Sequence, residues 1–300
     1  MIRFNAIYKT VPWGARRLQT HFSRQLPDGP VGEAWELVDL EGNASIALSG
    51  PFAGKTLSQL WRQEVLGGSG KGPFPFLLKW LDTNEFLSVQ VHPRLETCQK
   101  LGKGQPKTES WFFAHCDKHA ELYAGHKKGF TPEQLQHALL KKNIAQWLER
   151  LQPKTGDMIL LESGTIHALG PGYLVLEVQQ PSDTTYRVYD WDRVGLDGKP
   201  RSLHPEESLE SIDFTRSGSP PIVQNEIRGP CFYMKKIMSK TKLPDLGLRV
   251  IVSALGACSL QLEQEHVKLH FGDVVVLEAT EKNVQVLDEP CILISESVSE

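Results

Sequence analysis

The stretch Gly156-Asp157-Met158-Ile159-Leu160-Leu161-Glu162 returns later in the chain as Gly272-Asp273-Val274-Val275-Val276-Leu277-Glu278. Each copy begins with a glycine that can turn the chain, and each continues as a short apolar strand. A repeat of this kind indicates duplicated folding units, and glycine-led turns between short strands are typical of an antiparallel jelly-roll barrel. We therefore expect a mainly β protein that contains two such barrels.

The two copies differ in the residues that follow the strand. The first copy continues as Ser163-Gly164-Thr165-Ile166-His167, whereas the second continues as Ala279-Thr280-Glu281-Lys282-Asn283. Asn283 thus stands where the first copy has His167, a potential metal ligand. We expect the second barrel to be degenerate, with the fold retained and this ligand lost.

Elsewhere the chain follows the same pattern, with one helical exception. Thr131-Pro132-Glu133-Gln134 has the residues of a helix start, and apolar residues then recur at helical spacing until Pro153. This predicts one small helical segment near 131–152, and a proline-rich connector is expected at about 205–230. We expect residues 1–230 to form the domain that carries the site and residues 231–300 the degenerate β domain. Further strands are predicted at Trp35–Val38, Phe74–Leu81, Phe86–Val91, Tyr173–Gln179 and Thr185–Tyr189.

Composition excludes several classes of protein. The 300 residues carry a net charge of −3, and no block of like charge provides the basic face that nucleic acids or anionic membranes require. No apolar run is long enough to span a bilayer, and Met1–Phe4 does not open a signal peptide. Five cysteines without a CxxC pair predict reduced thiols in a cytoplasmic protein. The ten histidines remain to be explained.

Two segments place polar side chains on one face of a strand. In Ser88-Val89-Gln90-Val91-His92, alternation puts Ser88, Gln90 and His92 on the same side and the two valines on the other. In Lys107-Thr108-Glu109 the lysine and the glutamate likewise share a face. A polar strand face of this kind lines a cavity or meets solvent.

These residues, together with His167, form a set of potential metal ligands. Two imidazoles, one carboxylate and a nearby amide oxygen suit Zn²⁺, Fe²⁺ or Mn²⁺. A single histidine or glutamate on a strand is usually a surface or hydrogen-bonded residue, so the joint pattern is what indicates a site. Arg187 lies on a further predicted strand face with Thr185 and Tyr189. It belongs either to a surface ion pair or to the same cavity, where it would stabilise an anion.

The motifs resemble those of the type I phosphomannose isomerases (mannose-6-phosphate isomerases), zinc enzymes of the cupin superfamily, in their short bacterial form. The resemblance extends from about Lys9 to Phe214, and LSVQVHP and PKTESW at their present spacing are its most specific part. The matching segments are Trp13-Gly14, Gly32–Leu37, Pro75–Asp82, Leu87–Pro93, Pro106–Trp111, Ser163–Gly170 and Tyr186–Arg193.

This resemblance implies an activity and a set of site residues. The activity is the interconversion of mannose 6-phosphate and fructose 6-phosphate, with a small sugar phosphate as partner and one Zn²⁺ per chain. Arg187 matches the catalytic arginine of the family, and Ser88 and Lys107 match positions in the sugar-phosphate site. The general base is left open between Lys107, a metal-bound water and a further carboxylate. The implied zinc ligands are Gln90, His92, Glu109 and His167.

Two other functions use the same scaffold. One is a non-catalytic sugar-binding cupin, which has no reason to keep four ligands and Arg187 together. The other is an iron-dependent cupin oxidoreductase. Gln90 replaces the first histidine of the usual cupin pair, and fewer nitrogen donors fit a Lewis-acid site better than an oxygen-activating iron site. The sequence shows no dimer seam, so it predicts no oligomeric state.

Overall fold

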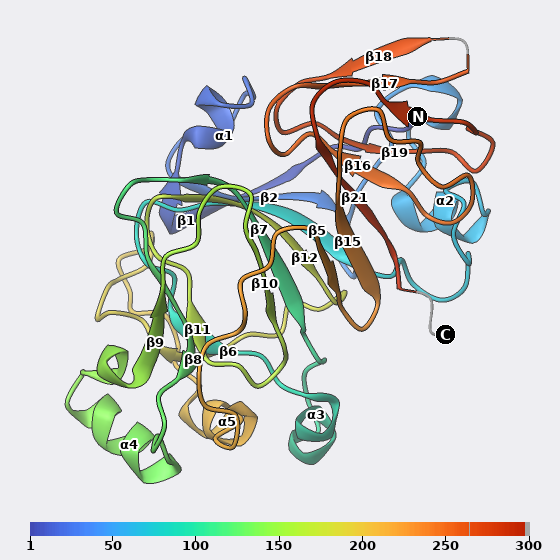
Figure 1. Ribbon diagram of the computed structural model, residues 1–300. Coiled ribbons are helices and arrows are strands. Elements are labelled where there is room, and N and C mark those ends of the chain that lie inside the picture. The colour runs from blue at the N-terminus through green and yellow to red at the C-terminus, as the bar shows by residue number, and fades with distance from the viewer. Residues whose placement is uncertain (264, 298–300) are drawn as a thin grey trace.

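The computed structural model describes residues 1–263 and 265–297 and consists mainly of antiparallel β-sheet (Figure 1). Two sheets formed by strands between residues 7 and 189 face each other, and we call them the first unit. In spatial order, the six-stranded sheet contains β1 (Ile7–Ala15), β2 (Val31–Leu37), β5 (Leu77–Asp82), β12 (Tyr173–Gln179), β7 (Glu109–Cys116) and β10 (Met158–Leu161). The five-stranded sheet contains β13 (Tyr186–Tyr189), β6 (Val89–Val91), β11 (His167–Ala168), β8 (Leu122–His126) and β9 (Leu148–Leu151).

A second pair of sheets forms the second unit, at the C-terminal end of the chain. Its five-stranded sheet contains β14 (Glu226–Arg228), β15 (Phe232–Ile237), β21 (Cys291–Glu296), β16 (Val250–Val252) and β19 (Val274–Val276). Its three-stranded sheet contains β18 (His266–Leu269), β17 (Cys258–Gln261) and β20 (Gln285–Val286). A separate hairpin joins β3 (Asp39–Leu40) to β4 (Asn43–Ala44). The predicted mainly β architecture is therefore confirmed, although in each unit the two sheets are separate in their hydrogen bonding.

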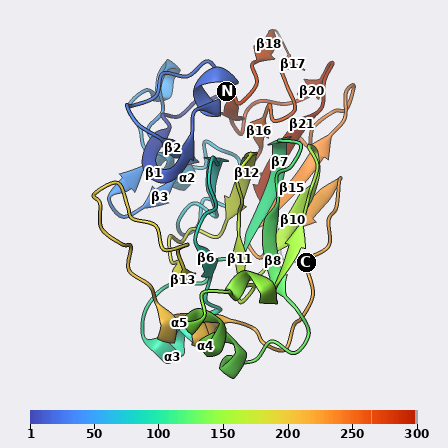
Figure 2. The same ribbon diagram turned by 90° about the vertical axis from the view of Figure 1, so that its left-hand side faces the viewer.

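Short helices complete the fold. Figures 1 and 2 show α3, α4 and α5 gathered at the end of the first unit that lies away from the second. Among the described residues, no helix is long and apolar enough to cross a membrane. The helices are α1 (Arg17–Thr20), α2 (Leu57–Arg62), α3 (Leu95–Leu101), α4 (Pro132–Leu140) and α5 (Pro205–Ser211), with 3₁₀ turns η1 (Gly50–Phe52) and η2 (Ile144–Trp147).

The helix predicted near 131–152 is much shorter than expected. Thr131 caps its start by accepting a hydrogen bond from the Gln134 amide, but α4 ends at Leu140 and Lys142 adopts a positive φ of 52°. The apolar residues beyond it belong to η2 and to β9, which pairs with β8. Tertiary pairing with a neighbouring strand thus overrides the local helical spacing. The prediction of a connector at about 205–230 was also wrong in part, because these residues include α5 and β14.

One hydrophobic core crosses the domain boundary that we expected at residue 230. It joins Trp80 and Leu176 of the first unit to Met234, Val252 and Ile294 of the second. The chain start also pairs with the second unit through a bridge between Ile2 and Val276. The boundary itself stays a prediction.

Candidate metal centre and substrate cavity

The strand β6 lies at the centre of the candidate site, because both neighbouring strands also carry site residues. Gln90 pairs with His167 of β11 on one side and with Arg187 of β13 on the other. Val89 and Val91 are buried in an apolar cluster with residues of α4 and of the strands around it. Gln90 therefore points the opposite way, into the first unit, as the predicted alternation requires.

His92, Glu109 and His167 meet in the interior of the first unit. Each offers one ligand atom, and these atoms all lie within 4.8 Å of one another. Nε2 of His92 lies 3.2 Å from Oε2 of Glu109, and Nε2 of His167 lies 3.3 Å from Oε1 of the same carboxylate. All three side chains are at most 2% exposed. Residues from β7, β11 and the segment after β6 thus form one compact cluster.

The hydrogen bonds of the two histidines fix which nitrogen faces the cluster. Nδ1 of His92 lies 2.9 Å from the carbonyl oxygen of Thr184, and Nδ1 of His167 lies 2.9 Å from that of Thr165. A carbonyl only accepts, so each Nδ1 carries the proton and each Nε2 presents a lone pair. Oε1 of Glu109 is buried without a hydrogen-bond partner in the described chain. Lone pairs therefore converge on one point, and a cation there would satisfy all of them.

The electrostatics keep this donor set deprotonated. Burial, together with the neighbouring Lys107, lowers the pKa of His92 to about 3. Burial also lowers the pKa of His167. Burial opposes the charge of Glu109, yet the ammonium of Lys107 holds the pKa of this carboxyl well below its usual value. Neutral imidazoles and an ionised carboxylate are the forms that bind a metal ion.

Lys107 connects this cluster to an adjoining cavity. Its ammonium lies against Oε2 of Glu109 and 3.1 Å from Nε2 of His92, so a positive charge already approaches the converging lone pairs. The cavity has a volume of about 250 Å³ and a strongly polar wall. Ser88, Gln90, Lys107 and Arg187, all predicted as site residues, line it together with Trp13, Glu33, Lys79, Leu81, Leu87, Glu177, Asp183, Thr185 and Arg201.

Comparison with known proteins places this chain in a family. The family model "Phosphomannose isomerase type I, catalytic domain" matches residues 1–108. The mannose-6-phosphate isomerase of Streptococcus mutans serotype c is 33% identical over 291 residues, covering 91% of this chain and 90% of that protein. The chain belongs to the type I mannose-6-phosphate isomerases.

Further relatives agree with this membership. The probable mannose-6-phosphate isomerase GmuF of Bacillus subtilis is 40% identical over 209 residues, which are 69% of this chain and 66% of that protein. The crystal structure of the mannose 6-phosphate isomerase from Bacillus subtilis superimposes with a TM-score of 0.86 at 31% identity and covers 99% of both chains. The expected cupin-type fold and the isomerase activity are thereby confirmed. Membership of an isomerase family also argues against a non-catalytic cupin and against an oxidoreductase.

Sequence reasoning missed a group of charged residues in the cavity of this isomerase. Nζ of Lys79 is buried on β5 and lies 3.5 Å from Glu177 of β12 and 3.6 Å from Glu33 of β2. Burial opposes the charge of Lys79, but the carboxylates around it raise its pKa. Glu177 also accepts a 2.8 Å hydrogen bond from the indole of Trp111, whose ring packs edge-on against His167. A charged residue inside an apolar strand, as in PFLLKWLD, was the available signal, since a buried charge needs a partner.

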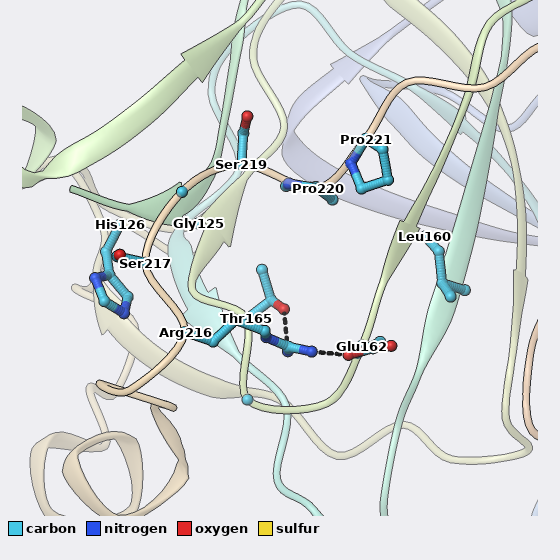
Figure 3. A pocket seen from close by; sticks show the side chains of 12 residues that line it. Gly125, His126, Leu160, Glu162, Thr165, Arg216, Ser217, Ser219, Pro220 and Pro221 are labelled. Carbon is cyan, nitrogen blue, oxygen red and sulfur yellow. Dashed lines mark hydrogen bonds and ion pairs between the residues drawn. The ribbon is translucent and has the colours of Figure 1, made fainter. Parts of the chain in front are cut away.

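A second cavity of the isomerase shares no lining residue with the first (Figure 3). Its volume is about 300 Å³, and residues 216–221 arch over it. Arg216 is its cationic side chain, but it pairs with Glu162 and donates a 2.9 Å hydrogen bond to Oγ1 of Thr165. Because this charge is already neutralised, the polar cavity beside the metal cluster is the better candidate for a charged substrate.

Proposed function

We propose that this isomerase interconverts mannose 6-phosphate and fructose 6-phosphate with one Zn²⁺ per chain, held by His92, Glu109 and His167. The observation that carries this proposal is the convergence of two Nε2 lone pairs and an unpartnered carboxylate oxygen beside the polar cavity. Nitrogen and oxygen donors without a thiolate suit Zn²⁺, and three protein ligands leave a position open for substrate. Nε2 of Gln90 lies 3.2 Å from Nε2 of His167, so rotation of the amide would turn its oxygen toward the same point as a further donor.

The reaction moves a proton between C1 and C2 of the open-chain sugar, and negative charge develops on the adjacent oxygens. When bound, Zn²⁺ supplies Lewis-acid polarisation of these oxygens. Arg187 keeps its guanidinium charge and stabilises the negative charge from the other side of β6. The hydroxyl of Ser88 and the side chain of Lys107 hold the sugar between them.

The proton transfer needs a base within reach of the C2 proton. Lys107 lies at the boundary between the metal cluster and the cavity, which favours it for this role. Glu177 is the second candidate because it lines the same cavity, and burial raises its pKa from the ordinary carboxyl value. A raised carboxyl pKa brings the group toward the proton affinity that suits a base near neutral pH.

The proposal is tested by a coupled assay for fructose 6-phosphate formed from mannose 6-phosphate. We expect chelation to abolish turnover and Zn²⁺ to restore it, with the sugar phosphate as the sole product. Aerobic product analysis after reconstitution with Fe²⁺ covers the oxidative alternative. Full turnover of the metal-free protein, or an oxidised product, would refute the proposed chemistry.

The role of Arg187 has its own test. Replacing it by alanine removes a charge that faces the cavity but touches none of the three proposed metal ligands, so we expect turnover to fall by about 10²- to 10³-fold. Metal content should remain that of the parent protein. Near-normal turnover of Arg187→Ala would show that the arginine does not stabilise the reacting sugar.

We place the enzyme in the cytoplasm. All five cysteines are free, and reduced thiols are typical of cytoplasmic proteins. Fractionation of the source cells should therefore recover the isomerase with the cytoplasmic fraction, and recovery outside the cytoplasm would contradict this assignment.

A further inference from the structure

Three arginines gather around a single buried carboxylate, Asp190, and two of them, Arg187 and Arg201, form one wall of the substrate cavity. Asp190 accepts hydrogen bonds from Nε and Nη2 of Arg193 at 3.1 and 2.8 Å and from Nε and Nη2 of Arg201 at 2.7 and 2.6 Å. Both of these arginines also lie close enough to Arg187 to lower its pKa, in addition to the larger effect of burial. The exposed Glu85, 3.6 Å from Arg193, is a further carboxylate there. In this group, three guanidinium groups therefore face two carboxylates.

Arg187 and Arg201 face the cavity, whereas Arg193 is absent from its lining. Burial and the neighbouring Arg201 lower the pKa of Arg187. Nη1 of Arg187 donates to the carbonyl of Ser202, but its Nε is buried without a partner in the described chain. Arg201 bonds to Asp190 through Nε and Nη2, which leaves Nη1 available to a ligand. An anion at this wall would accept hydrogen bonds from these guanidinium nitrogens.

The arginine wall is far enough from the metal cluster to bind the opposite end of an extended substrate. His167 and Arg187 lie on opposite sides of Gln90, so their strands are about 10 Å apart, twice the usual strand spacing. An open-chain hexose 6-phosphate carries its reacting carbonyl at one end and its phosphate at the other. The metal cluster and the arginine wall therefore provide two separated sites within one cavity.

We propose that Arg201, held in place by Asp190, anchors the phosphate group of the substrate and so determines the preference for phosphorylated sugars. Guanidinium groups bind phosphate oxygens through paired, charge-assisted hydrogen bonds, and a guanidinium whose other edge is fixed loses little freedom on binding. Arg201 lies on the segment between β13 and α5, far in sequence from the metal cluster. This inference rests on the proposed function, because it concerns the substrate of the same site.

The test compares Arg201→Gln with Arg193→Gln, a matched variant that also loses a partner of Asp190 but changes no residue lining the cavity. For Arg201→Gln we expect KM for mannose 6-phosphate to rise about 10- to 100-fold, with a much smaller change in kcat. Competitive inhibition by inorganic phosphate should weaken by a similar factor. In Arg193→Gln both constants should stay within about threefold of the parent values, because no cavity charge is lost.

A third variant and a binding measurement keep the outcome interpretable. Arg201→Lys keeps the charge without the planar fork, so it should recover part of the phosphate affinity measured by calorimetry with inorganic phosphate. An active Arg201→Gln enzyme with unchanged KM and unchanged phosphate inhibition would overturn the inference while leaving the isomerase function intact. Equal losses in Arg193→Gln and Arg201→Gln would also overturn it, because they would reduce Arg201 to a structural partner of Asp190. A parent protein that binds phosphate through Arg201 but forms no fructose 6-phosphate would instead refute the proposed function.

Discussion

The two β units share a turn but not a site. In the first unit, Gly156 has a φ of 93° and Asp157 accepts a 2.8 Å hydrogen bond from the amide of Lys154. In the second unit, Gly272 has a φ of 87° and Asp273 accepts a 2.9 Å bond from the amide of His270. Both turns lead into a strand buried in its sheet, β10 or β19. The repeated motif therefore encodes the same local structure twice.

The units diverge a few residues beyond this strand. His167 enters the interior beside Glu109, whereas the exposed Asn283 has a φ of 55° and bonds with Lys242 and Asp245 at the surface. The interior of the second unit is filled by apolar side chains such as Leu260, Val275 and Val286. The comparison shows that the scaffold depends on glycine-led turns and apolar strands, while the site depends on a few polar residues that face inward.

Loss of a cluster residue should have the largest effect on the site of the first unit. We expect His92→Ala, Glu109→Ala and His167→Ala each to lose bound metal and to reduce turnover by more than about 100-fold, because a ligand and its charge are removed. Metal content by elemental analysis and the coupled assay provide the measurements. His126→Asn is the matched control, since His126 is equally buried but bonds with the Asp213 carbonyl outside the cluster. Normal metal content in all three alanine variants would refute the ligand assignment.

A substitution that creates a cavity in the interior of the second unit should lower stability and leave the metal site of the first unit intact. Leu260 is fully buried in the apolar interior, so Leu260→Ala should lower the free energy of unfolding by about 2–5 kcal/mol. Denaturant titration measures this change, and the metal content and KM of the folded variant should match those of the parent. Loss of metal from a folded Leu260→Ala protein would show that the two units do not act separately.

The pH dependence of the metal-free protein should reveal the buried histidine of the first unit. Folded His92 has a pKa of about 3 against an ordinary value of 6.5, so below pH 6.5 only the unfolded chain takes up this proton. Stability should therefore decrease as pH falls from about 6.5 toward 3, with a contribution from His92 of up to about 1.4 kcal/mol per pH unit. His92→Gln should show a shallower slope in denaturant titrations across this range. Equal slopes for the two proteins would contradict a neutral, buried His92.

Restoring the missing histidine should have the smallest effect. Asn283→His places an imidazole at the position that corresponds to His167, but Asn283 is exposed and lies in a different local conformation. We expect metal content to remain at one ion per chain and stability to change by less than about 0.5 kcal/mol. A second bound ion per chain would show that the second unit retains more of a site than its apolar interior suggests.

Much of the first unit could be predicted from the sequence, because the patterns that indicate its strands lie within short segments of the chain. Alternation at Ser88–His92 predicted which side chains face inward, and the resemblance linked these residues to Glu109 and His167. The cavity charges escaped prediction because Lys79, Glu177 and Arg201 gain their surroundings only from strands and loops distant in sequence. The helix expected beyond Leu140 failed for a related reason, since pairing with β8 decides the structure of residues 148–151.

The isomerase reaction should depend on one metal ion bound in the first unit. The most direct measurement titrates metal-free protein with Zn²⁺ while following fructose 6-phosphate formation. We predict that activity rises from background and saturates at one equivalent of Zn²⁺ per chain, and that Glu109→Ala shows no such rise. Full activity before Zn²⁺ is added, or saturation only at two equivalents, would contradict the account.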